Sequence, residues 1–72
     1  MLQVRFLNDK QKEEEPNEFS SWDKFFAYLR DRWNYNEGAF NYGVTRINKT
    51  TYRYITYAFT MIITTSGREV RP

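Results

Sequence analysis

The fold of this chain is decided by TTYRYITYAFTMIITT, residues 50–65. The stretch has one charged residue, no Gly and no Pro, and is rich in Thr, Tyr and Ile, as is typical of a β-strand. Read as one continuous strand, it has two faces that could both be buried. One face carries Arg53, Ile55, Tyr57, Phe59, Met61 and Ile63, and the other carries Tyr52, Tyr54, Thr56, Ala58, Thr60 and Ile62. A chain of 72 residues can cover only one of them, so the other is a candidate binding surface.

Composition limits the classes of protein to consider. Seventy-two residues predict a single small domain, residues 1–72. With no Cys and no His, zinc and iron–sulfur sites are excluded, and we expect no metal and no cofactor. The core must come from six Phe, six Tyr and two Trp. No signal peptide and no span of about 20 apolar residues is visible, so we expect a cytoplasmic, free-standing gene product without a membrane segment.

Charge is distributed unevenly along the chain. The net charge is +2, but residues 1–37 hold six basic and eight acidic groups, whereas residues 38–72 hold five basic groups and one acidic group. The second half therefore favours an anionic partner, or else a solvated basic edge that discourages aggregation of the sheet.

The first half predicts one strand, a loop and one helix. Leu2, Val4 and Phe6 alternate with polar residues, which indicates a half-buried strand. Residues 8–18 are polar and contain a Pro, and we expect a surface loop. Ser20 or Ser21 is a candidate N-cap for an amphipathic helix that ends near residues 36–38. Its expected core stripe is Trp22, Phe25, Phe26, Leu29 and Trp33.

The second half predicts a hairpin. Residues 40–45 alternate like a strand, and Asn48-Lys49 is a plausible two-residue turn that places Val44 opposite Arg53. The polar tail, residues 66–72, is expected to fray. The predicted fold class is α+β with the order β-α-β-β: a three-stranded antiparallel sheet of order 2-3-1, with one helix packed on one face.

Three surfaces are candidate binding sites. The uncovered sheet face would present Tyr52, Tyr54, Thr56 and Arg5, and charge-poor aromatic patches suit a protein partner. The solvent side of the helix would present Tyr28, Arg32 and Tyr35, unless these rings rest on residues 8–18. The hairpin tip would present Arg46, Lys49, Arg53 and Tyr52, which could contact phosphates and bases.

Catalysis is poorly supported, because the chain has no His, no Cys and no phosphate-binding glycine motif. We expect a non-enzymatic protein-binding module that occludes the surface of a host protein or of a second copy of itself. A small accessory or inhibitory protein of the phage or mobile-element type would fit this size. The alternative function is nucleic-acid binding through the basic, aromatic hairpin.

Overall fold

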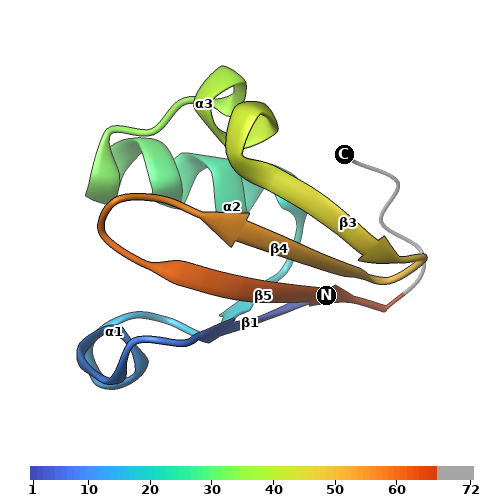
Figure 1. Ribbon diagram of the computed structural model, residues 1–72, viewed down its shortest axis with the longest axis horizontal. Helices are drawn as coiled ribbons and strands as arrows, with labels where there is room; N and C mark the ends of the chain where they lie inside the picture. The colour runs from blue at the N-terminus through green and yellow to red at the C-terminus, as the bar shows by residue number, and fades with distance from the viewer. Residues whose placement is uncertain (67–72) are drawn as a thin grey trace.

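The computed structural model describes residues 1–66, which form an antiparallel sheet with helices on one face (Figure 1). In chain order the elements are β1 (Leu2–Phe6), α1 (Asp9–Glu14), β2 (Glu18–Phe19), α2 (Trp22–Tyr28), the π-helical turn η1 (Leu29–Trp33), α3 (Glu37–Gly43), β3 (Val44–Asn48), β4 (Thr51–Ile55) and β5 (Thr60–Thr65). Within this part of the chain the sheet has five strands in the order β2-β1-β5-β4-β3. Figure 1 shows α2 and α3 on one side of the sheet and α1 beyond β1.

The predicted three-stranded sheet of order 2-3-1 with one helix is wrong. Residues 50–65 form two paired strands, β4 and β5, in place of one long strand. A strand of sixteen residues would be about 50 Å long, whereas a single helix of that many residues spans about 24 Å and cannot cover it. Folding the stretch back on itself brings all of its large residues within reach of the helices.

A four-residue connection makes this fold-back. Ile55 pairs with Thr60, and the intervening turn is closed by the Thr56 N–H, which donates to the Phe59 carbonyl at 2.8 Å. The Thr56 hydroxyl accepts hydrogen bonds from the N–H groups of Ala58 and Phe59 at 3.1 and 3.0 Å. The hydrogen bonds of a threonine side chain therefore stabilise this turn, which contains neither of the usual turn residues glycine and proline.

The turn exchanges the two faces of the predicted strand. Tyr54 pairs with Met61 and Tyr52 pairs with Ile63. The even-numbered residues of β4 therefore share a face of the sheet with the odd-numbered residues of β5. The four paired residues are buried, at 5% exposure or less. Ile55, in contrast, lies on the opposite face and is 51% exposed. The expectation that Tyr52 and Tyr54 lie on the uncovered face is therefore wrong.

Residues 40–45 are mostly helical, although they alternate like a strand. The Asn36 side chain caps α3 by accepting from the Ala39 N–H at 2.8 Å, and Phe40 is fully buried while Tyr42 is 96% exposed. β3 begins only at Val44, which pairs with Tyr54, so the predicted pairing with Arg53 is off by one residue. The turn falls at Lys49 and Thr50, because Asn48 pairs with Thr51.

The predicted helix begins as expected and ends early. Ser21 is its N-cap, with its side chain accepting from the Lys24 N–H at 3.2 Å. The apolar stripe faces the core. After Tyr28 the helix continues as η1 and ends at its C-cap Asn34, whose φ of 62° lies in the left-handed region. Residues 8–18, predicted as a loop, contain α1 and the first residue of β2. The predicted frayed tail lies outside the described residues except for Ser66, whose hydroxyl accepts from the Met1 amine at 3.3 Å.

Aromatic rings dominate the core between the sheet and α2, η1 and α3. The ring of Phe40 lies 4.7 Å from that of Tyr54, and the ring of Trp22 lies 5.6 Å from that of Tyr52. Edge-to-face and tilted pairs of this kind add stability beyond the area they bury. The buried apolar set is Leu2, Val4, Phe6, Trp22, Phe25, Leu29, Phe40, Tyr52, Tyr54, Phe59, Met61 and Ile63.

Gly43 provides a test of how closely α3 and β4 pack. A Cβ atom at this position would lie 2.8 Å from the Ile55 carbonyl oxygen and 3.0 Å from the Tyr54 ring. We expect Gly43→Ala to lower the free energy of unfolding by about 1–3 kcal/mol, because the backbone of β4 must shift. Gly38→Ala is the matched control, since its Cβ would meet only the Asn36 side chain at 3.4 Å. Urea unfolding of both variants checks this, and equal stabilities would contradict the close approach.

Candidate partner-binding surfaces

The tyrosines predicted to anchor a partner belong to the core. Tyr52 is 5% exposed and Tyr54 is 1% exposed. Burial is the main cause that raises the pKa of Tyr54 to about 12, with a smaller contribution from Tyr35. Neither ring is available to a partner without unfolding of the sheet, so the uncovered face must be described from other residues.

The hairpin tip is occupied by its own contacts. The guanidinium of Arg46 donates to the carbonyl oxygens of Asn48 and Lys49, at 3.2 and 3.3 Å, and its Cζ lies 5.8 Å from the centre of the Tyr52 ring. Lys49 is exposed in the turn, and Arg53 points away from Arg46 because alternate residues of paired strands face opposite sides. The structure therefore does not bring Arg46, Arg53 and Tyr52 together on one accessible surface.

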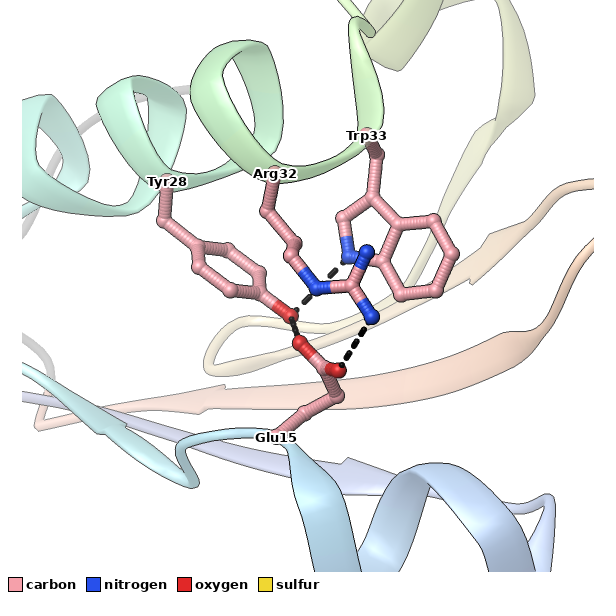
Figure 2. Close-up of polar contacts among 4 residues, drawn as sticks. All are labelled: Glu15, Tyr28, Arg32 and Trp33. Atoms are coloured by element: carbon pink, nitrogen blue, oxygen red, sulfur yellow. Dashed lines mark hydrogen bonds and ion pairs between the residues drawn. The ribbon is translucent and has the colours of Figure 1, made fainter.

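The helix tyrosine and arginine meet a carboxylate from the segment predicted as a loop (Figure 2). The Tyr28 hydroxyl donates to Glu15 Oε1 at 2.5 Å, and Arg32 Nη2 lies 3.0 Å from Glu15 Oε2. Trp33 Nε1 donates to the Tyr28 hydroxyl at 3.0 Å. The Glu15 side chain is only 4% exposed, whereas that of Arg32 is 50% exposed. The interpretation that Tyr28 rests on residues 8–18 is confirmed.

We name these four residues the Glu15 clasp. Both carboxylate oxygens are satisfied by α2 and η1, so the charge of Glu15 is neutralised within the protein. The pKa of Tyr28 is raised above its ordinary value of 10.0, chiefly by burial and then by the hydrogen bond to Glu15. The Tyr28 hydroxyl therefore stays protonated and donates to Glu15. The clasp therefore ties the end of α1 to the helical layer, which is a structural role.

The other two predicted residues also have structural contacts. Thr56 closes the β4–β5 turn, as described above. Tyr35 is half-buried and packs its ring 6.2 Å from that of Phe59. Of the residues predicted for the protein-binding surfaces, Arg5 alone both lies on the uncovered sheet face and is exposed there.

We call the uncovered side of the sheet the open face. Cross-strand neighbours place Arg5, Ile62, Arg53 and Thr45 in one row across β1, β5, β4 and β3. Within residues 1–66, neither the Arg5 nor the Arg53 guanidinium takes part in a hydrogen bond or ion pair. Two unpaired arginines therefore flank Ile62, which is partly exposed.

One end of the open face is apolar. The Leu7 N–H donates to the Thr60 carbonyl at 2.9 Å, and Thr60 pairs with Ile55, so these three residues form the next row. Leu7 is 45% exposed and Ile55 is 51% exposed. Tyr57, fully exposed in the adjoining turn, lies beyond the same end of the sheet. Ile55 was not predicted on this face, because residues 50–65 were read as one strand.

A hollow of about 550 Å³ lies between α1 and the open face. Its lining residues are Gln3, Val4, Arg5, Phe6, Lys12, Glu15, Asn17, Ile62 and Thr64. Gln3, Arg5, Ile62 and Thr64 also belong to the open face, so the hollow and that face are continuous. The hollow was not predicted from the sequence, because residues 8–18, which contain α1, were read as a loop.

Comparison with protein-family models, with curated proteins and with solved structures gives no match for the chain. Within residues 1–66, no group of three or more acidic, His or Cys side chains is placed to hold a metal ion. None of the helices in this part has the length and apolar character that crossing a membrane requires.

Removing the Tyr28 hydroxyl tests the Glu15 clasp. We expect Tyr28→Phe to lower the free energy of unfolding by about 1–3 kcal/mol, because both Glu15 and Trp33 lose a partner. Tyr35→Phe is the matched control, since within residues 1–66 its hydroxyl makes no hydrogen bond, and we expect a change within about 0.5 kcal/mol. Chemical unfolding of the two variants measures the difference, and similar values would show that the clasp contributes nothing.

The raised pKa of Tyr54 predicts a loss of stability in alkali. Because the folded protein holds the phenol proton up to about pH 12 while the unfolded chain releases it near pH 10.0, stability should fall as pH rises through this window. Tyr28 contributes in the same direction. Urea midpoints below and within the window measure the effect. A pH dependence that is the same in Tyr54→Phe as in the parent protein would contradict this assignment.

Proposed function

We propose that this chain is a non-enzymatic, cytoplasmic protein-binding module whose open face covers an acidic surface of another protein. The observation that carries the proposal is the pair Arg5 and Arg53 on either side of Ile62, neither of which has a hydrogen-bonding or ionic partner within residues 1–66. An exposed guanidinium that has no ionic partner among the described residues is poised to meet a carboxylate of another protein. Occlusion of the partner's surface is then the mode of action.

The apolar end of the face supplies the second element of an interface. Leu7, Ile55 and Tyr57 are large and exposed, and they adjoin the arginine row. Interfaces combine apolar and aromatic anchors with arginine, while acidic and lysine residues are depleted from their centres. The arginine row and its apolar end follow this pattern, and Glu18, the acidic residue of the face, lies on the edge strand β2 and accepts a hydrogen bond from Gln3.

A protein partner fits the face better than nucleic acid. Proteins that bind single strands stack successive bases on several exposed rings, but Tyr57, in the β4–β5 turn, is the one exposed aromatic ring at the described part of the open face. Tyr52, expected to stack from the hairpin, is buried. Nucleic acid remains the alternative through Lys49, Arg5 and Arg53, and it predicts binding that weakens steeply with added salt.

A second copy of the chain fits less well than a foreign protein. Face-to-face pairing about a two-fold axis would bring the same basic row of each copy against the other, and like charges repel. We therefore expect light scattering at high concentration to report the mass of the monomer, about 8.8 kDa. The assignment to accessory or inhibitory proteins of the phage or mobile-element type stays a prediction.

Capture and charge reversal test the proposal. The immobilised chain is exposed to a lysate of the cells that produce it, retained proteins are identified by mass spectrometry, and affinity for the purified candidate is measured by calorimetry. We expect Ile55→Asp and Arg53→Glu each to weaken binding by about tenfold or more, because each removes an anchor of the open face.

Arg30→Glu is the matched control. Arg30 is exposed on η1, in the helical layer, and its partner is the neighbouring Asp31. Circular dichroism of every variant establishes that the fold is retained. A captured protein whose affinity falls with Arg30→Glu but not with Arg53→Glu would contradict the use of the open face. Retention of nucleic acid alone would favour the alternative function.

A further inference from the structure

The hollow beside α1 is lined by residues of α1 as well as by residues of the open face, and two of the lining residues are cationic. Arg5 enters it from β1 and Lys12 enters it from α1, so two cationic side chains line one cavity from different elements. Its volume, about 550 Å³, is within the range of small-ligand sites.

The acidic residue that lines the hollow does not pair with Arg5. Glu15 is held through both carboxylate oxygens by Tyr28 and Arg32 in the clasp, and its side chain is 4% exposed. Arg5, in contrast, has no hydrogen-bonding or ionic partner within residues 1–66. The hollow therefore keeps an unused guanidinium, whose planar fork matches a carboxylate in bidentate geometry.

The remaining lining residues suit the stem and surroundings of an acidic side chain. Ile62 supplies apolar contact, and Gln3, Asn17 and Thr64 supply neutral polar groups. This mixture fits one carboxylate on an aliphatic stem better than a compact dianion, which requires more donors to replace its water.

We propose that the hollow receives a single carboxylate side chain, from Glu or Asp, of an acidic segment that lies across the open face. This inference rests on the proposed function, since it names the chemistry that the same face recognises. Arg5 contacts the carboxylate, and Ile62 contacts its stem. The Glu15 clasp acts as a positioning element, because it holds α1 at the rim of the hollow.

Amide chemical shifts of the isolated chain test the hollow without the natural partner. The probes are a blocked Thr-Glu-Thr-Glu-Thr peptide, the same peptide with Gln in place of Glu, and inorganic phosphate at matched ionic strength. We expect saturable shifts at Gln3, Arg5, Ile62 and Thr64 with the Glu peptide, with a Kd of about 1 mM. The Gln peptide should bind at least about tenfold more weakly, since it lacks the charge-assisted hydrogen bonds.

Variants separate this site from general basic charge. Arg5→Gln should weaken binding of the Glu peptide by about tenfold, while Arg30→Gln, exposed on η1, should leave it unchanged. Equal binding of the Gln peptide, equal binding of phosphate, or shifts that survive Arg5→Gln would each overturn the proposal. If the peptide fails while a captured partner still depends on Arg53 and Ile55, the hollow is wrong and the open face stands. If the peptide binds but no partner is captured, the site stands and the proposed function fails.

Discussion

The four-residue connection between β4 and β5 is the constraint on which the rest of the structure depends. Because Ile55 pairs with Thr60, the turn of Thr56 to Phe59 reverses which residues face the helices. Tyr52 and Tyr54 then join Met61 and Ile63 in the core, while Arg53 and Ile55 move to the open face with Ile62. If β4 shifted by one residue against β5, Arg53 would be buried and the rings of Tyr52 and Tyr54 would be exposed. Burial of the charge and exposure of the rings would both destabilise the fold.

The Glu15 clasp connects this core to the surface on which a partner would bind. It joins α1 to α2 and η1 through a nearly buried carboxylate, so the helix at the edge of β1 is held in place. The hollow exists because α1 stands beside the open face there. Within residues 1–66 Arg5 has no ionic partner, since Glu15, the acidic side chain in the lining, is already paired with Arg32.

The sequence predicts much of the local structure and little of the topology. Three local predictions were correct, because capping and periodicity are local signals: an N-cap at Ser20 or Ser21, which is Ser21, the apolar stripe from Trp22 to Trp33, and the half-buried strand at Leu2–Phe6. The β4–β5 turn was missed because its sequence, Thr-Tyr-Ala-Phe, contains no Gly, Pro, Asn or Asp. Residues 40–43 were misread because alternation of Phe40 and Tyr42 outweighed the Asn36 cap. Arg5 was placed correctly on the open face, whereas Tyr52 and Tyr54 were not, since the pairing of β4 with β5 is not encoded in the strand pattern.

The most direct test of this account is nuclear Overhauser contact between the backbones of Tyr54 and Met61 in the folded protein. The structure pairs these residues across β4 and β5, and it predicts strong contacts between them, together with contacts between Arg53 and Ile62. If residues 50–65 formed one extended strand, Tyr54 and Met61 would lie about 23 Å apart and no such contact would be seen. That result would return the two tyrosines to a different face from Met61 and would remove the basis for the open face.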